Sequence, residues 1–434
     1  MTTNSHFART PSVIIESMKN VSSLGEVEAI LLSYAPNRMY VADYKLERVR
    51  LLHERIGNPQ DNLKVVHVTG TSGKTSTAYF VRALLESTGA KVGLTVSPHI
   101  KTTCERIQVN GGPLSESAFV SYFNEFYALV EGLEPRPTYF ELMTAFAYWV
   151  FEKEKVDYAV VEVGLGGRYD ATNIVSRNDK VCIINSIGYD HTEIFGDSLT
   201  AIANEKAGII QESNKVFTVP QDEEARVVIE KQASEKHADV MVITPTLDHA
   251  SEVPVFQQHN FQLALAAARY VAKRDGLKLP DTVDLLVNAT AVPGRYETYT
   301  IGEKTVVLDG AHNPQKLEAL IDVLSHTYKE PAVVIAGLSE APTKKVVECV
   351  RLLSNFATRV LYTTFAVQRD VTRYSVRLDV FSGLKREQDE MIEKPSDALE
   401  RALQADEKLV VVTGSLYLVS IVRPFVRERA GLSD

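Results

Sequence analysis

A glycine-rich turn between an apolar strand and a helix constrains this sequence more than any other feature. Residues 65–69 are mostly β-branched, the turn Gly70-Thr71-Ser72-Gly73-Lys74-Thr75-Ser76 follows, and residues 77–85 have the apolar spacing of a helix. The two glycines allow successive backbone N–H groups to point inward, the helix N-terminus adds partial positive charge, and Lys74 adds a full charge. The pattern predicts a phosphate-binding loop whose last hydroxyls lie near a bound metal ion.

An ordinary strand-to-helix turn is the alternative for this loop. Its spacing departs from the standard Walker A motif, which places glycine where this chain has Val68. Glycine-rich turns also occur without any phosphate ligand. Because the strand, the Gly-Lys-Thr sequence and the helix occur together, the phosphate-binding interpretation is favoured.

Length and composition narrow the class of protein. A chain of 434 residues is too long for one ordinary core, so two or three domains are expected. The net charge of -9 argues against nucleic-acid binding, and no apolar run approaches the eighteen or so residues of a membrane span. The N-terminus lacks the apolar core of a secretion signal. Three scattered cysteines, Cys104, Cys182 and Cys349, form neither a disulfide framework nor a metal-ligand pattern, so a cytoplasmic protein is expected.

Alternating strands and helices predict an α/β fold with two units. Residues 1–292 form a large domain with N-terminal helices and a P-loop NTPase-like parallel sheet, and residues 293–434 form a smaller Rossmann-like α/β domain. The turn around Pro293-Gly294 is the predicted boundary. Strands are expected at 65–69, 91–96, 156–163, 181–187, 216–219 and 240–243, then at 305–308, 332–336, 360–364 and 409–412.

Polar residues follow several of these strands. Ser97, Glu162 and the pair Asp190-His191 come at or after strand ends, where parallel sheets bind ligands. A hydroxyl, a carboxylate and an imidazole near phosphate oxygens suit Mg²⁺. Each of them alone is an ordinary turn or structural residue, and Lys206 by itself is a solvated helix lysine. Their convergence with the phosphate loop favours a nucleotide site.

The motif order resembles that of folylpolyglutamate synthases and dihydrofolate synthases, in the Mur ligase superfamily. The resemblance spans about residue 40 to the C-terminus. It rests on these segments in sequence: 70–76, 97–99, 105–107, 138–141, 162–173, 190–191, 205–208, 293–295, 309–314 and 413–415.

The resemblance implies roles for individual residues. ATP phosphates are held by Gly70, Thr71, Ser72, Gly73, Lys74, Thr75 and Ser76, and the rest of the nucleotide by Asn260, Arg295 and Asp309. Two Mg²⁺ ions are held by Ser97, Glu162, His191 and Lys206, the lysine carrying a carbamate made from CO₂. His312 lies beside the nucleotide and, with Lys74, Glu162, His191 and Lys206, belongs to the catalytic set. The pterin side of the acceptor is contacted by Thr138, Tyr139, Phe140, Glu141, Tyr169, Asp170 and Ala171.

The implied reaction is an ATP-dependent amide ligation. The γ-phosphoryl group activates a carboxylate as an acyl phosphate, which the amine of L-glutamate then attacks. Closure of the small domain on the large one at the Pro293-Gly294 hinge protects the activated acid from water. Folate or pteroate, glutamate and ATP are the expected partners of a monomeric enzyme, with neither nucleic acid nor a membrane involved.

Departures from the family pattern leave the acceptor open. Ser72 and Thr75 stand where the family usually has asparagine and glycine, and Tyr169 and Tyr189 stand where leucine is commoner. Dihydropteroate, a reduced folate or both are the first interpretation, and a non-folate carboxylic acid is the second. A nucleotide-binding regulatory protein is the third, although a mere switch does not require two lysines, a glutamate and a histidine together.

Overall fold

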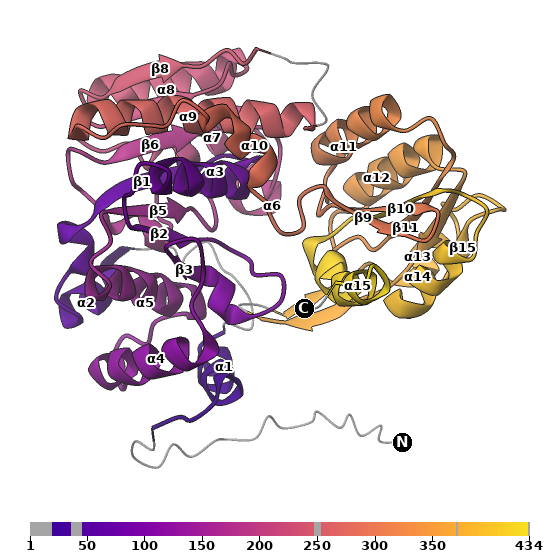
Figure 1. Ribbon diagram of the computed structural model, residues 1–434, viewed down its shortest axis with the longest axis horizontal. Coiled ribbons are helices and arrows are strands. Elements are labelled where there is room, and N and C mark those ends of the chain that lie inside the picture. Colours follow the sequence, from indigo (N-terminus) through magenta and orange to yellow (C-terminus); the bar gives the residue numbers. More distant parts are fainter. Residues whose placement is uncertain (1–19, 36–45, 247–252, 370–371, 433–434) are drawn as a thin grey trace, which may run out of the picture.

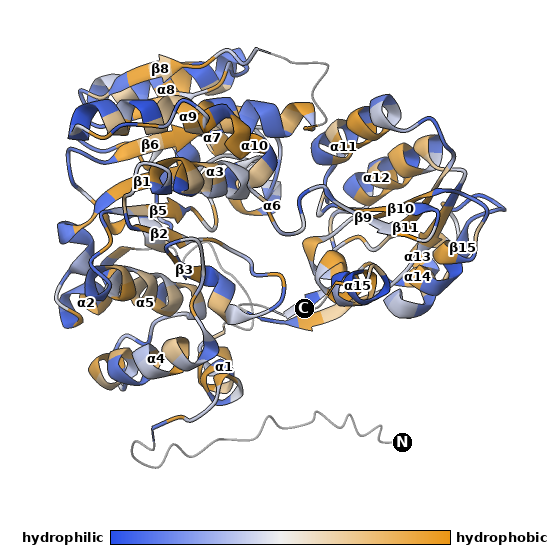
Figure 2. Cartoon of the chain, viewed as in Figure 1, coloured by the Kyte–Doolittle hydropathy of each residue, from blue (hydrophilic) through white to orange (hydrophobic). Residues whose placement is uncertain are grey.

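The computed structural model describes residues 20–35, 46–246, 253–369 and 372–432. It contains two separate α/β units, each built on its own sheet (Figure 1). Both sheets run as apolar bands through the middle of their units, and the polar residues gather on the outer faces of the helices (Figure 2). The P-loop NTPase-like and Rossmann-like α/β architecture expected from the sequence is confirmed. In the described residues, no helix is long and apolar enough to cross a membrane.

The first sheet has eight strands in the order β4-β3-β2-β5-β1-β6-β7-β8. The strand that leads into the phosphate loop, β1, is central, pairing in parallel with β5 and β6. Among the described strands of this sheet, β3 runs against the others, pairing antiparallel with β2 and, in a hairpin at the edge, with β4. The strands are β1 (Lys64–Thr69), β2 (Val92–Thr95), β3 (Ile107–Val109), β4 (Gly112–Pro113), β5 (Tyr158–Glu162), β6 (Val181–Ile184), β7 (Lys215–Thr218) and β8 (Asp239–Val242).

Helices cover both faces of this sheet because successive strand side chains alternate between them. Val66 and Val68 pack under α3 and α9, and Val65 packs on the opposite face with α5. The helices are α1 (Leu24–Ser33), α2 (Leu46–Arg55), α3 (Lys74–Glu86), α4 (Glu116–Val130), α5 (Tyr139–Lys153), α6 (Thr192–Phe195), α7 (Leu199–Ala207), α8 (Glu223–Glu235), α9 (Val255–Asp275) and α10 (Leu286–Ala289), with short 3₁₀ turns η2 (Pro59–Asn62), η3 (Thr103–Arg106), η4 (Ala171–Ile174) and η5 (Val283–Leu285).

The second sheet has six strands in the order β15-β12-β11-β16-β10-β9, all parallel except β9. A separate hairpin is formed by β13 and β14. The strands are β9 (Glu297–Ile301), β10 (Lys304–Leu308), β11 (Ala332–Ala336), β12 (Arg359–Tyr362), β13 (Ala366–Gln368), β14 (Thr372–Tyr374), β15 (Glu390–Met391) and β16 (Leu409–Thr413). The helices are α11 (Pro314–Thr327), α12 (Thr343–Phe356), α13 (Leu378–Phe381), α14 (Pro395–Leu403) and α15 (Leu416–Arg429).

Most elements lie where the sequence predicts them, and the differences have local causes. The predicted strand at 156–163 is shorter, because residues 156–157 precede the ladder that begins at Tyr158. The helix α8 and the strands β9, β13, β14 and β15 were not expected. The N-terminal helices expected in the large domain are described in part, as α1 and α2, and residues 1–19 lie outside the described part. The domain boundary at 292/293 remains a prediction.

Candidate active site

The phosphate loop has the backbone geometry that its glycines predict. Gly70 and Gly73 have φ angles of 143° and 83°, and Gly73 is the N-cap of α3. A Cβ on Gly73 would lie 2.2 Å from Oδ1 of Asn260, so that position also has no room for a larger residue. The Ser72 hydroxyl is buried and has no hydrogen-bond partner in the described part of the chain. An unpaired hydroxyl inside a glycine cradle suits a phosphate oxygen.

The loop is fixed to the segment that follows β6. The Thr71 hydroxyl donates to the carbonyl of Gly188 at 3.0 Å and accepts from the Gly188 amide at 3.1 Å. The Lys74 ammonium donates to the carbonyl of Gly70 at 3.0 Å. Burial lowers the pKa of Lys74, although Glu162 nearby acts in the opposite direction. Lys74 is therefore held inside its own loop, in reach of an anion placed there.

Glu162 connects three of the predicted residues. Its side chain is 3% exposed, and one carboxylate oxygen accepts from the Thr75 hydroxyl at 2.7 Å. The other accepts from the backbone N–H of Ser97 at 3.2 Å. Burial raises the pKa of Glu162, and no lysine or arginine forms a salt bridge with it in the described residues. A buried carboxylate between two hydroxyl residues is a donor set that suits Mg²⁺, which binds few protein oxygens and retains phosphate and water ligands.

Lys206 lies inside the molecule, which corrects its interpretation as a solvated helix lysine. It is 6% exposed at the end of α7 and donates to the Gly70 carbonyl at 3.1 Å. Burial, reinforced by the charge of Lys74, lowers the pKa of Lys206 to about 7. A large fraction of this amine is therefore neutral at physiological pH.

His191 lies at the rim of the site. It has a φ of 52° and a half-exposed side chain, and its Nδ1 lies 3.7 Å from a carboxylate oxygen of Glu193. It lines the same cavity as Glu162. No group of three or more His, Cys, Asp or Glu side chains in the described residues forms a ready cation site. The carboxylate, the hydroxyls and the imidazole are thus spread around a space that phosphate oxygens would have to complete.

Three predicted residues come from the second domain. Asp309 is 6% exposed and accepts from the amides of Tyr296 and Ala311, and burial raises its pKa. The Nδ1–H of His312 donates to the Gly310 carbonyl at 2.9 Å. Burial lowers the pKa of His312 to about 4, so the ring is neutral at pH 7. Arg295 lines the same cavity.

Two lysines that sequence reasoning missed converge on Asp190 from the second domain. Lys316 on α11 and Lys345 on α12 each place their Nζ 3.3 Å from an Asp190 carboxylate oxygen. Burial alone would raise the pKa of Asp190, but His312 and Lys316 hold it well below its usual range. No local signal identifies these lysines, because their partner lies 126 and 155 positions earlier in the chain.

An asparagine pair closes the other side of the cradle. The Asn185 side-chain amide donates to Oδ1 of Asn260 at 3.1 Å and to the Thr77 hydroxyl at 2.9 Å. Asn185 was not predicted, although it follows β6 directly. Its Oδ1 is buried without a hydrogen-bond partner in the described part of the chain.

Some of the residues expected to bind the acceptor have structural contacts instead, and others lie beside the site. Thr138 and Glu141 form a capping box at the start of α5, and Arg48 binds Glu141 through two nitrogens at 2.6 and 2.8 Å. Phe140 lines a small hollow together with Arg106 and Glu162, beside the cradle. Tyr139 is 2% exposed. Of this segment, Phe140 is the side chain directed toward the site.

The second expected acceptor segment is also partly structural. Asp170 is buried and accepts from the amides of Leu165 and Thr172, at 2.8 and 3.0 Å. Ala171 is buried as well. Tyr169 is 47% exposed and available to a ligand.

One cavity of about 570 Å³ joins the two domains. A space of this size is sufficient for a nucleotide. Its lining includes the whole phosphate loop and, from the predicted set, Ser97, Glu162, His191, Lys206, Asn260, Arg295, Asp309 and His312. The segments 138–141 and 169–171 do not line it.

Comparisons with known proteins agree with this arrangement. The family described as the Mur ligase middle domain matches residues 68–266, and the family described as the Mur ligase glutamate ligase domain matches residues 294–416. A dihydrofolate synthase/folylpolyglutamate synthase of Bacillus subtilis is 33% identical, over 87% of this chain and 94% of the relative. 

Two solved structures have the same fold over nearly the whole chain. Mycobacterium tuberculosis folylpolyglutamate synthase, complexed with ADP and AMPPCP, is 26% identical with a TM-score of 0.80, covering 93% of this chain and 98% of its own. Escherichia coli FolC in complex with DHPP and ADP is 27% identical with a TM-score of 0.80, covering 95% and 100%.

Proposed function

This chain belongs to the folylpolyglutamate synthase and dihydrofolate synthase family of Mur ligases, and we propose that it joins L-glutamate to the carboxylate of a folate or pteroate with ATP. The observation that carries the proposal is the cavity of about 570 Å³ between the domains. It brings Lys74 and Glu162 of the first domain opposite Arg295, Asp309 and His312 of the second. A ligase must bring three substrates to one place, and a cavity lined from both domains suits that task.

ATP phosphates occupy the glycine cradle in this proposal. The backbone N–H groups at the start of α3 and the Lys74 ammonium bind the β- and γ-phosphates, while Asn260, Arg295 and Asp309 contact the rest of the nucleotide. The carboxylate of the acceptor attacks the γ-phosphorus and ADP leaves, which forms an acyl phosphate. The glutamate amine then attacks the carbonyl carbon, the amide forms and inorganic phosphate leaves.

Glu162, with the Thr75 and Ser97 hydroxyls, is the set that would hold Mg²⁺, and His191 and Lys206 are the candidates for a second ion. When bound, Mg²⁺ neutralises charge on the phosphate oxygens during transfer. The protein contribution is orientation, because Glu162 is fixed from both sides by the Thr75 hydroxyl and the Ser97 amide. Titration of the protein with Mg²⁺ and ADP, compared with Glu162→Gln, tests this donor set.

Lys206 is proposed to carry a carbamate. Its buried amine has a pKa of about 7, and only the neutral form has the lone pair that attacks CO₂. The N–C bond forms and one proton is released, so that the neutral amine becomes an anionic carbamate beside Lys74; counted from the ammonium form, two protons are released. That change replaces a repulsion between two buried ammonium groups with an attraction. A carbamate carbon signal after addition of ¹³C-bicarbonate, absent in Lys206→Ala, supports the assignment.

Lys316 and Lys345 are the proposed anchors for the glutamate substrate. Glutamate carries two carboxylates, and these two ammonium groups already bind the carboxylate of Asp190 at the edge of the cavity. An incoming carboxylate can share or replace that contact. The glutamate amine would then lie on the second-domain side of the cleft, across from the phosphate loop.

Phe140 and Tyr169 remain the candidates for contact with the acceptor ring. Aromatic side chains stack on flat heterocycles, and Tyr169 is exposed enough to do so. A related ligase acting on a non-folate acid is the alternative, favoured only by Tyr169 and Tyr189 in place of leucine.

A monomer is proposed because one chain supplies every group named above, and a cytoplasmic location because ATP and folates are available there.

The deciding experiment measures phosphate release and product mass with Mg-ATP and L-glutamate. One reaction contains dihydropteroate and the other tetrahydrofolate. Glutamylated product from either supports folate chemistry, and the pattern distinguishes a synthase, a chain extender or both. A folded protein that binds ATP but makes neither product contradicts the proposal and favours another carboxylic acid.

A further inference from the structure

An arginine of the second domain reaches across to the loop that follows β2. Arg369 lies at the end of β13, in the hairpin that extends from the second domain toward the first (Figure 1). Its guanidinium donates to the carbonyl of His99 through Nη1 and to the carbonyl of Ile100 through Nη2 at 3.0 Å. Both acceptors belong to the first domain.

The same guanidinium is fixed within its own domain. Its Nη2 also donates to the Ser420 hydroxyl at 3.1 Å, and its carbon lies 5.6 Å from the ring centre of Tyr417. Both residues are on α15. Because the planar fork of arginine binds two acceptors in one orientation, Arg369 transmits the position of α15 to the carbonyls it contacts.

The loop that receives Arg369 is rigid and reaches the active site. The Glu105 carboxylate accepts from the amides of Ile100 and Lys101 at 2.7 and 2.6 Å. Arg106 donates to Nδ1 of His99 at 2.9 Å. Two residues before His99, the backbone N–H of Ser97 donates to Glu162. A displacement at His99 and Ile100 is therefore carried to Ser97.

Apolar contacts at the hinge turn reinforce this coupling. A Cβ on Gly294 would lie 2.8 Å from Leu416 and 3.0 Å from Ile100. The turn between the domains thus lies directly against both the loop and the start of α15. Relative motion of the domains about this turn must change the distance from Arg369 to its two carbonyl acceptors.

We propose that Arg369 is a positioning residue that aligns the loop 97–100, and with it Ser97 and Glu162, to the second domain before the amine attacks. This rests on the proposed ligase function. Without that alignment the acyl phosphate persists beside a misplaced amine. Water then attacks it, which returns the carboxylate and releases inorganic phosphate without amide formation.

The test compares Arg369→Ala with Arg377→Ala, which removes an exposed arginine of the same domain that pairs with Asp379, two residues later. Tetrahydrofolate, L-glutamate and Mg-ATP are supplied, and phosphate and glutamylated product are measured separately. In the wild type and Arg377→Ala the ratio of phosphate to amide stays near one. Arg369→Ala lowers kcat for amide formation by roughly tenfold and raises that ratio severalfold, while ADP affinity is unchanged. Arg369→Lys, which keeps the charge but loses the planar fork of nitrogens, lies between them.

Two outcomes overturn the proposal. One is a ratio that stays near one in Arg369→Ala at normal kcat, and the other is a parallel loss of both products in proportion to unfolded protein. A wild type that makes no glutamylated folate contradicts the ligase assignment instead. 

A second measurement does not depend on turnover. Because the native cysteines are buried, fluorophores can be attached at Ser234→Cys and Glu387→Cys. With Mg-ADP, Arg369→Ala should broaden the distribution of transfer efficiency between the domains relative to Arg377→Ala. Identical distributions count against the coupling.

Discussion

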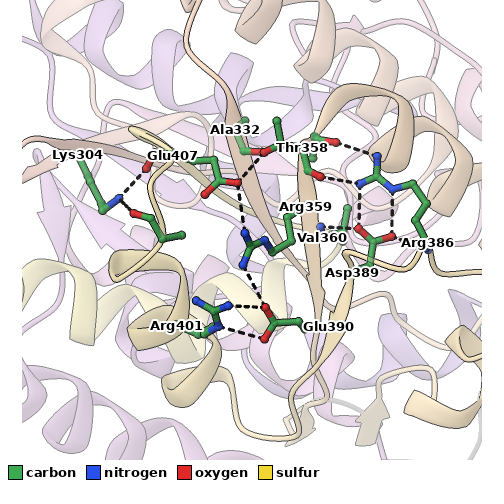
Figure 3. Close-up of polar contacts among 12 residues, drawn as sticks. Lys304, Ala332, Thr358, Arg359, Val360, Arg386, Asp389, Glu390, Arg401 and Glu407 are labelled. Carbon is green, nitrogen blue, oxygen red and sulfur yellow. Dashed lines mark hydrogen bonds and ion pairs between the residues drawn. The ribbon is translucent and has the colours of Figure 1, made fainter.

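Charged residues are arranged differently at the two ends of the strands of the second sheet. The amino edge is the side on which the parallel strands begin, and the carboxyl edge is the side on which they finish. At the amino edge, Arg359 and Arg401 share the carboxylate of Glu390, and Arg386 binds Asp389 through two nitrogens (Figure 3). At the carboxyl edge, which faces the phosphate loop, Lys316 and Lys345 share the single carboxylate of Asp190. In the first group, Arg386 and Arg401 each bind a carboxylate through two nitrogens. The second group concentrates cations around few anions.

The arrangement at the amino edge stabilises the folded protein, and the arrangement at the carboxyl edge serves the reaction. Paired arginine forks compensate for the desolvation of their charges within the protein. In the cleft, burial lowers the pKa values of Lys74, Lys206 and Lys316, the last two to about 7 and 8. Such a group of buried cations destabilises the folded state until an anion binds. The cleft is therefore organised around charges that ATP and the two acids bring with them.

The largest effect is expected from Lys74→Met in the cleft. Ligation should fall by about 10³-fold because the cation nearest the transferred phosphate is lost. Thermal stability should hold or rise, since a buried charge is removed. Lys304→Met at the amino edge loses two hydrogen bonds to the carbonyls of Ala405 and Glu407. It should lower thermal stability and leave ligation unchanged. If both variants lose activity and stability together, the contrast between the edges fails.

Asp389→Ala should break the amino-edge network. It leaves the Arg386 guanidinium and the Val360 amide without their carboxylate, at a cost of about 2 to 3 kcal/mol in unfolding free energy. Turnover per folded molecule should not change. Urea titration measures the first quantity and initial rates the second. Contact with Arg386 holds the pKa of Asp389 low against the effect of burial, so this stabilisation is present above pH 4 and is lost on acidification.

Lys345→Met should affect one substrate only. The KM for glutamate should rise about tenfold, because a charged hydrogen bond to its carboxylate is removed, while the KM for ATP remains unchanged. Steady-state kinetics with each substrate varied in turn distinguish the two. Lys344→Met, an exposed neighbour on the same helix, is the control. Equal rises in both KM values would indicate that Lys345 supports the packing of the cleft and does not bind glutamate specifically.

The carbamate on Lys206 should depend on pH in the range where its amine titrates. Burial disfavours the protonated amine, so the neutral fraction rises from about one tenth at pH 6 to about nine tenths at pH 8 around a pKa of about 7. The ¹³C carbamate signal should rise over the same range. A signal that is constant from pH 6 to 8, or stronger at pH 6, would disagree with this account.

The sequence predicted local features well because their causes are local. Gly70 and Gly73 have the positive φ angles that a phosphate loop built on glycine requires. The positions of most strands along the chain followed from their apolar runs, and the phosphate loop followed from the strand, the Gly-Lys-Thr sequence and the helix. Glu162 and Ser97 were expected together because both follow neighbouring parallel strands.

What the sequence missed depends on distant contacts or weak patterns. The helix α8 is mostly polar, with a narrow apolar stripe that includes Ala225 and Val228. The strand β9 alternates as an antiparallel edge strand and lacks the continuous apolar run of its neighbours. Lys345 and Arg369 are ordinary surface residue types, and each has a partner on the other domain. Burial of Lys206 likewise comes from packing that no local pattern reveals.

Oxygen transfer from the acceptor to phosphate tests the central claim most directly. In the proposed mechanism, the cleft activates a folate-type carboxylate as an acyl phosphate before glutamate attacks. With both carboxylate oxygens labelled as ¹⁸O, mass spectrometry should find one ¹⁸O in each phosphate released during glutamylation, and one remaining in the amide. Glutamylated product accompanied by unlabelled phosphate would contradict the account.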